Sequence, residues 1–118
     1  MAGHANCDGC DGPGHEMKST PGGKFPPNPF GLYDMVGNVW TWMEDCWNPN
    51  YDGAPNDGSA WLSGNCSLRG KRTGSWFNLA APRPKDPRAP GRMRSSDRFG
   101  SIPDLRIASF GFRVVREL

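Results

Sequence analysis

Glycine and proline interrupt almost every part of this chain and limit the regular structure that it can form. The sequence has 16 glycines and 12 prolines among 118 residues, and no amphipathic helix of useful length fits between them. Five tryptophans and six phenylalanines, in contrast, are more than disordered chains usually carry. We therefore expect a single ordered, loop-rich domain that is built around aromatic anchors.

Three segments are candidates for short strands. Between residues 39 and 44, Trp40 and Trp42 alternate with smaller or more flexible side chains, which is the two-residue period of a strand. This alternation places both tryptophans on one face, and we interpret both as core residues. Residues 67–77 predict a second strand that runs to the end of that range. Residues 110–116 alternate again and predict a closing strand.

The rest of the chain contains few other features that indicate its structure or location. Residues 1–24 have no apolar period and are interpreted as an N-terminal loop segment, followed by a domain at residues 25–118. No stretch approaches the roughly 20 apolar residues of a membrane span, so we expect no membrane insertion. No apolar leader follows Met1, and the cellular compartment stays unknown.

Charge is distributed unevenly along the chain. Residues 1–66 carry two basic and eight acidic groups, whereas residues 67–118 carry twelve basic and four acidic groups. Such asymmetry is typical either of two halves that pack and neutralise each other or of an anion-binding surface. The arginines are spread out rather than clustered, so we favour the first interpretation and do not expect nucleic acid as a partner.

Four cysteines permit three disulfide pairings, and the sequence does not choose among them. Cys46 and Cys66 flank a loop of turn-forming residues, and a disulfide between them would close a loop of about 20 residues and stabilise the fold by roughly 3 kcal/mol. This pair is our disulfide candidate, and it is compatible with an oxidising compartment.

Cys7 and Cys10 form a Cys-x-x-Cys pair that has two histidines close by. With His4 and His15 they would supply the four ligands of a zinc site. Structural zinc sites usually draw their ligands from two separated pairs, so three alternatives stay open. These are a disulfide between Cys7 and Cys10, pairing with the other two cysteines, and a disordered tail.

Four short motifs follow one another from residue 25 onward. Residues 25–42 read FPPNPFGLYDMVGNVWTW, residues 72–76 read RTGSW, residues 103–106 read PDLR and residues 111–116 read GFRVVR. Together they resemble the formylglycine-generating enzyme (sulfatase-modifying factor) family. The resemblance implies an α+β fold that is irregular and loop-rich, a C-type-lectin-like variant with short antiparallel strands and little helix. It also implies that the chain corresponds to the C-terminal half of a longer domain.

Different lineages of this family imply different functions. One oxidises a sulfatase cysteine to formylglycine with copper and oxygen, and a second forms part of sulfoxide synthases. A third comprises the variable display proteins of diversity-generating retroelements. The resemblance to the oxidising enzymes predicts a cysteine two residues after Trp76 and another shortly after it. Asn78 occupies the first position, and residues 67–118 contain no cysteine. Because thiolates are the ligands that suit Cu(I), copper is not expected here.

The missing cysteines favour binding over catalysis. We predict a non-catalytic domain that binds a protein or small-molecule ligand, with part of a sulfatase-modifying or sulfoxide-synthase oxidoreductase as the alternative. A display surface would lie between residues 77 and 109, where an additional Pro- and Arg-rich stretch either reshapes the family's groove or is a plain surface loop. The predicted ligand-binding residues are Trp76, Phe77, Asn78, Arg94, Asp97, Phe99, Leu105 and Ile107.

Calcium is the remaining cofactor that the resemblance implies. Its ligands would be the Asp34 carboxylate, the Gly37 and Val39 carbonyls and position 41, where the family has glutamate and this chain has Thr41. Calcium prefers six to eight oxygens that include carboxylates, so the site would be weakened. The alternative role for Asp34 is to cap a turn. A second family site would involve Asn6 and the Cys7 carbonyl.

Overall fold

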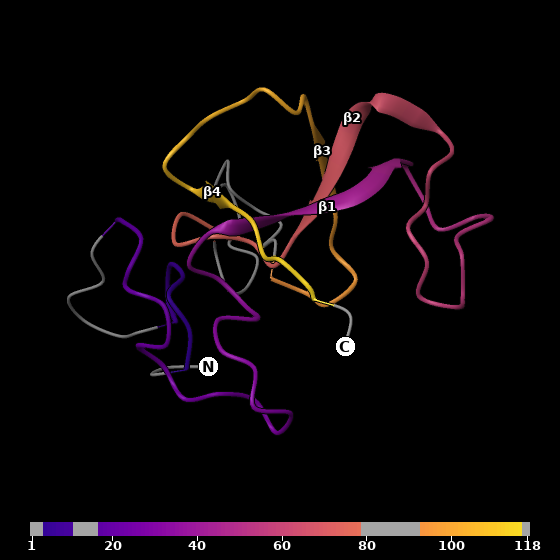
Figure 1. Ribbon diagram of the computed structural model, residues 1–118. Coiled ribbons are helices and arrows are strands. Elements are labelled where there is room, and N and C mark those ends of the chain that lie inside the picture. Colours follow the sequence, from indigo (N-terminus) through magenta and orange to yellow (C-terminus); the bar gives the residue numbers. More distant parts are fainter. Residues whose placement is uncertain (1–3, 11–16, 79–92, 117–118) are drawn as a thin grey trace.

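The computed structural model describes residues 4–10, 17–78 and 93–116, and this part of the chain contains four strands and no helix (Figure 1). They are β1 (Trp40–Trp47), β2 (Asn65–Arg72), β3 (Phe99–Ser101) and β4 (Phe110–Gly111), which form one sheet in the order β3-β2-β1-β4. The irregular, loop-rich fold is confirmed. The two long strands pair antiparallel as predicted, but β4 runs parallel to β1, so the sheet is mixed. No helix long and apolar enough to cross a membrane occurs among these residues.

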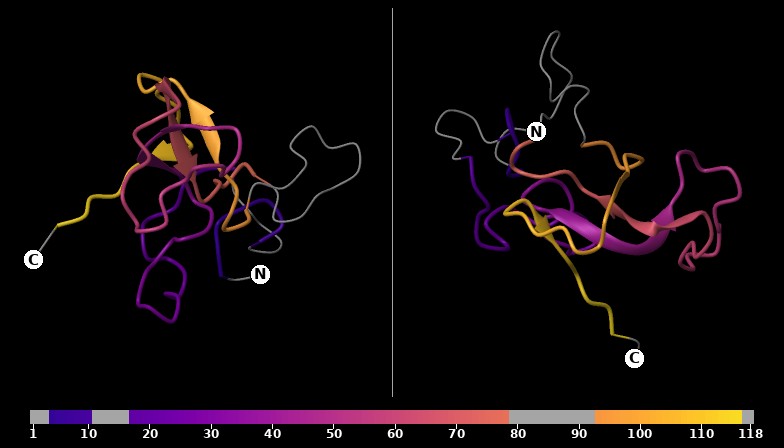
Figure 2. Two further views of the ribbon diagram at one scale, coloured as in Figure 1. Left: turned by 90° about the vertical axis from the view of Figure 1, so that its right-hand side faces the viewer. Right: turned by 90° about the horizontal axis from the view of Figure 1, so that it is seen from above.

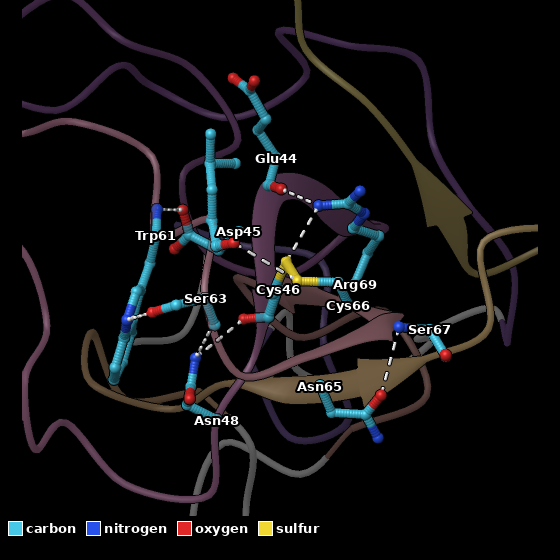
Figure 3. The surroundings of a disulfide bond; sticks show 11 residues. Glu44, Asp45, Cys46, Asn48, Trp61, Ser63, Asn65, Cys66, Ser67 and Arg69 are labelled. Carbon is cyan, nitrogen blue, oxygen red and sulfur yellow. Dashed lines mark hydrogen bonds between the residues drawn. A yellow bond between two sulfur atoms is a disulfide. The ribbon is translucent and has the colours of Figure 1, made fainter.

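The β1–β2 ribbon is held at its far end by the disulfide between Cys46 and Cys66 (Figure 3). The pairing of these strands is irregular between Trp42 and Trp47, which is typical of β-bulges. The loop between the strands is bonded back to the sheet, because the Asp45 carboxylate accepts the Trp61 N–H at 2.9 Å. Cys7 and Cys10 form the second disulfide. Both pairs are compatible with an oxidising compartment.

Two predicted strand boundaries were wrong. The strand expected to reach residue 77 ends at Arg72, because Thr73 (φ 81°) and Gly74 (φ 66°) adopt left-handed backbone conformations that no strand continues through. The closing strand pairs only over Phe110–Gly111. Beyond it, residues 112–116 are exposed and run away from the sheet, as both views in Figure 2 show.

Buried apolar residues lie in more than one part of the described structure. Trp40 at the start of β1 is a core residue and is 6% exposed, as predicted. Trp42 is only half-buried, and its ring makes an edge contact with Phe110 at 5.3 Å. A separate cluster lies at the N-terminal side, where Met93 packs with Ala5 and with Cys7 and Cys10.

The turn before β1 joins the N-terminal segment to the sheet. Gly37 forms a parallel bridge with Asn6, and its φ of 78° is a conformation that favours glycine. The Asn38 side chain then binds the backbone of Thr20 on both sides, accepting its N–H at 2.9 Å and donating to its carbonyl at 3.0 Å. Asn6 and Thr20 therefore join the N-terminal segment to the turn that precedes β1, and this segment lies at the end of the sheet where β1 begins (Figure 1).

Candidate functional site

A cavity of about 560 Å³ opens beside β1 and the end of β2. Side chains on the same face of an antiparallel pair come from opposed positions, and Thr41 is opposed to Arg72 across β1 and β2. Met43 lies two residues further along β1 and on the same face. The cavity is lined by Met35, Val36, Thr41, Trp42, Met43, Arg72, Thr73, Met93, Arg94, Ser95, Arg113 and Val115.

Methionine dominates the apolar part of this cavity. Three of the five methionines of the chain line it, from three separate segments: Met35, Met43 and Met93. Met93 is buried at the inner side, whereas Met35 is exposed. Methionine is flexible and polarisable and adapts to irregular shapes, which is why it is common at surfaces that bind varied ligands. The wall is therefore able to adjust to an apolar body.

Three arginines supply the charge of the cavity, and none of the described lining residues is acidic. Arg113 donates from Nη2 to the carbonyls of Tyr33 and Asp34 at 2.7 and 2.8 Å. Arg72 donates to the Ser95 carbonyl. Carbonyls orient these guanidinium groups but leave their charge in place. The cavity therefore has a positive character that favours an anion.

Arg94 differs from the other two arginines. Its backbone N–H donates to the Asp97 carboxylate at 3.2 Å, and the Asp97 N–H returns to the Arg94 carbonyl at 3.0 Å. This local turn fixes the backbone at the rim of the cavity. Within the described part of the chain, the Arg94 guanidinium has no hydrogen-bond or carboxylate partner, and the residue is exposed. Its donors are available to a ligand.

The eight predicted ligand-binding residues lie on several segments of the described structure. Only Arg94 lines the cavity. The Trp76 and Phe77 rings meet edge to face at 5.9 Å, and Asn78 closes a turn with Ser75. Asp97 caps the Arg94 turn. The remaining three lie on β3 or on the exposed connection to β4: Phe99, Leu105 and Ile107.

The other face of the sheet holds a lysine among aromatic rings. Lys71 on β2 is 4% exposed, and its Nζ lies 3.4 Å from the centroid of the Phe110 ring, 5.0 Å from that of Phe99 and 5.2 Å from that of Trp40. Burial lowers the pKa of the Lys71 amine from 10.5 to about 8. The rings partly offset this effect, because the faces of aromatic rings attract a cation.

Sequence reasoning missed most of the cavity and the lysine. The cavity residues come from segments that are far apart in the sequence. Lys71 lies in a segment that was predicted as a strand, but nothing near it in the sequence indicated that aromatic rings from β1, β3 and β4 would surround it. Both features arise when the chain folds and brings together residues that are far apart in the sequence.

The predicted metal ligands are found mainly in turn contacts. Asp34 has a φ of 53°, and its Oδ2 accepts the N–H of Gly23, which lies 11 residues earlier in the chain, at 2.8 Å. The Val39 carbonyl accepts the Thr73 hydroxyl at 3.1 Å. In the second predicted site, the Asn6 Oδ1 is buried and has no hydrogen-bond partner among the described residues.

The disulfide between Cys7 and Cys10 is one of the alternatives to the zinc site. His15 lies outside the described residues. Within the described part, no group of three or more histidine, cysteine or acidic side chains gathers to hold a metal. The additional Pro- and Arg-rich stretch likewise falls largely in residues 79–92, outside the described residues.

Comparison with known proteins places this geometry in a family. Residues 8–118 match the Sulfatase-modifying factor enzyme 1-like domain. The chain is 36% identical over 95 residues to the protein named Inactive C-alpha-formylglycine-generating enzyme 2 of Bos taurus, an alignment that covers 80% of this chain and 25% of that protein. The chain therefore spans about a quarter of the length of this relative.

Two solved structures share the fold. PvdO from Pseudomonas aeruginosa matches with a TM-score of 0.73 and 39% identity, over 95% of this chain and 38% of PvdO. Treponema denticola variable protein 1 matches with a TM-score of 0.68 and 28% identity, over 93% of this chain and 34% of that protein. The family motifs and the fold agree with these matches. The chain belongs to the sulfatase-modifying factor family, which includes the formylglycine-generating enzymes.

Proposed function

We propose that this chain is a non-catalytic binding domain of the sulfatase-modifying factor family. The observation that carries the proposal is Asn78, which stands where the oxidising enzymes have a thiolate. Its Oδ1 accepts the Ser75 N–H at 3.0 Å and the Ser75 hydroxyl at 2.8 Å, and its carbonyl accepts the Asp8 N–H. The side chain therefore closes a turn and supplies no copper ligand.

Two further observations support this proposal. Residues 67–118 contain no cysteine that would replace the missing thiolate. The relative from Bos taurus, which aligns with 80% of this chain, is itself named an inactive enzyme. The open cavity on the sheet gives a binding domain a place for its ligand.

The direct test is an oxidation assay with a sulfatase-derived peptide that contains the target cysteine. We expect the chain, loaded with copper and supplied with oxygen, to form no formylglycine and to consume no oxygen above the level of copper alone. Mass spectrometry of the peptide measures the product, and an active formylglycine-generating enzyme is the positive control. Formylglycine formed in proportion to the added chain would contradict the proposal and favour the oxidoreductase alternative.

A display role is a second candidate, supported by the likeness to the Treponema denticola variable protein. Four of the predicted contact residues are large apolar side chains that are at least 37% exposed: Phe77, Phe99, Leu105 and Ile107. Such exposure suits positions that contact a partner. Sequences of close sister copies test this role. Differences should concentrate at these four positions and at Asn78 and Asp97, and identical residues there would rule the display role out.

We propose calcium only as a weak ligand at Asp34. One Asp34 carboxylate oxygen already accepts the Gly23 N–H, Thr41 replaces the family's glutamate, and the Arg113 guanidinium binds the Asp34 carbonyl. A single carboxylate beside a fixed cation attracts calcium poorly. We therefore expect half-saturation on the order of 1 mM, as in weak extracellular sites.

Thermal unfolding in the presence of calcium, magnesium or EDTA tests this site. Calcium at about ten times the dissociation constant should stabilise the fold by about 1.4 kcal/mol. The Asp34→Gly variant tolerates the positive φ and should lose the response, whereas Asp52→Gly in an exposed loop should keep it. An unchanged transition across all calcium concentrations would exclude the site.

A further inference from the structure

The cavity beside β1 combines a methionine wall with three arginines and no acidic side chain among its described lining residues, and this combination selects a ligand class. We propose that the cavity binds an amphiphile that has an apolar body and a single anionic head group. The body lies along the methionine wall formed by Met35, Met43 and Met93, and the head group lies at Arg94. This inference rests on the proposed binding function and names its ligand chemistry.

The charge of the cavity requires the anionic head. Three guanidinium groups line it, and the described lining residues include no carboxylate that would neutralise them. Arg72 and Arg113 are held in place by backbone carbonyls, so their charges are fixed at the wall. Among the described residues, Arg94 is the one of these three arginines whose guanidinium has no hydrogen-bond partner. A planar guanidinium with free donors binds a carboxylate or sulfonate through two parallel hydrogen bonds.

The walls of the cavity require the apolar body. Met93 and Val36 lie at the inner side and contact the buried N-terminal group, while Val115 at the mouth is 93% exposed. Covering these side chains removes apolar surface from water, which is favourable in proportion to the area covered. A cavity of about 560 Å³ lies within the range of small-molecule sites. An inorganic anion would leave this surface exposed and would gain only the charge interaction.

The two requirements separate the candidate ligands. An anionic amphiphile both covers the apolar walls and pairs with the arginine charge. A neutral amphiphile only covers the walls, and a cationic one is repelled by the three arginines. We therefore expect dodecanoate to bind more tightly than dodecanol, and dodecyltrimethylammonium to bind least. Raising the salt concentration should weaken dodecanoate more than dodecanol, because salt screens the exposed arginine.

The test uses displacement of 8-anilinonaphthalene-1-sulfonate, a fluorescent anionic amphiphile, from the purified chain, at ligand concentrations below micelle formation. Arg94→Gln should weaken dodecanoate binding about five- to tenfold and leave dodecanol unchanged, because one exposed charge-assisted contact is lost. The matched control is Arg106→Gln, an exposed arginine outside the cavity, which should bind dodecanoate as the unmodified chain does. Thermal unfolding of both variants checks that they are folded.

Several outcomes would overturn the inference. Equal weakening by Arg94→Gln and Arg106→Gln would show general charge attraction instead of a site. Dodecyltrimethylammonium binding as tightly as dodecanoate would show unspecific apolar adsorption, and no displacement by dodecanoate would show that the cavity does not accept this class. These failures leave the proposed binding function in place, since that function fails only if the chain forms formylglycine.

Discussion

Replacing Gly37 with alanine is expected to lower the free energy of unfolding by about 2–5 kcal/mol, the largest effect of a single substitution that we predict. Gly37 has a φ of 78°, and a Cβ at this position would overlap the carbonyl oxygen of Asn6. The substitution therefore adds backbone strain and forces the N-terminal segment away from the start of β1. Urea unfolding followed by tryptophan fluorescence measures the change.

A second glycine separates the two causes. Gly53 has nearly the same φ, 77°, but a Cβ there would meet no atom within 4 Å. Gly53→Ala should therefore cost only the backbone strain, about 1–2 kcal/mol. The difference between the two losses in free energy of unfolding measures the cost of placing a Cβ at position 37 against the Asn6 carbonyl. Equal losses in the two variants would show that the N-terminal segment does not pack against Gly37 as described.

Replacing Lys71 with methionine is expected to stabilise the protein at pH 7 by about 1–3 kcal/mol. The fall of the pKa of Lys71 from 10.5 to about 8 on folding corresponds to a desolvation cost of roughly 3 kcal/mol for the charged amine. The contacts with the Phe110, Phe99 and Trp40 rings return part of this cost. Methionine fills a similar volume without carrying a charge into the aromatic face.

The effect should depend on pH in a defined direction. Between pH 8 and 10.5 the unfolded lysine stays protonated while the folded one loses its proton, so the unfolded state binds more protons. The stability of the unmodified protein should therefore rise through this window relative to that of Lys71→Met. The advantage of the variant should shrink from pH 7 to pH 10, and urea unfolding at pH 7, 8.5 and 10 measures it.

The control is Lys24→Met, because Lys24 is an exposed lysine near a single aromatic ring, that of Phe25. This variant should follow the unmodified protein at every pH. The prediction would be contradicted if the stabilities of the unmodified protein and of Lys71→Met differed by the same amount at every pH from 7 to 10. This result would mean that the rings hold the amine charged and that burial does not lower its pKa.

Local chemistry was enough to predict the general character of this protein. Turn-forming residues excluded helices, the alternation around Trp40 predicted β1, and the loop between Cys46 and Cys66 suggested the disulfide that the structure contains. The ordered motifs also predicted the family. These features depend on neighbouring residues or on short loops, and the sequence specifies them directly.

Strand boundaries depended on contacts outside each segment. The prediction that β2 reaches residue 77 failed, because Thr73 is left-handed and its hydroxyl binds the Val39 carbonyl of another segment. Trp42 is half-buried instead of core, since it lies over the short β4 and not beneath a further layer of the described structure. The alternation of residues gives the face of a strand but not what covers that face.

The sequence by itself determined the family, the loop-rich class and the absence of the thiolate at Asn78, whereas it offered the disulfide between Cys46 and Cys66 only as a candidate that the structure contains. Only the tertiary structure decided where the cavity lies, because Met35, Met43, Met93 and Arg113 belong to separate segments that come together in the folded chain. It also decided the environment of Lys71, which three other strands surround. Burial and electrostatic environment come from contacts between distant segments, and those contacts exist only in the folded chain.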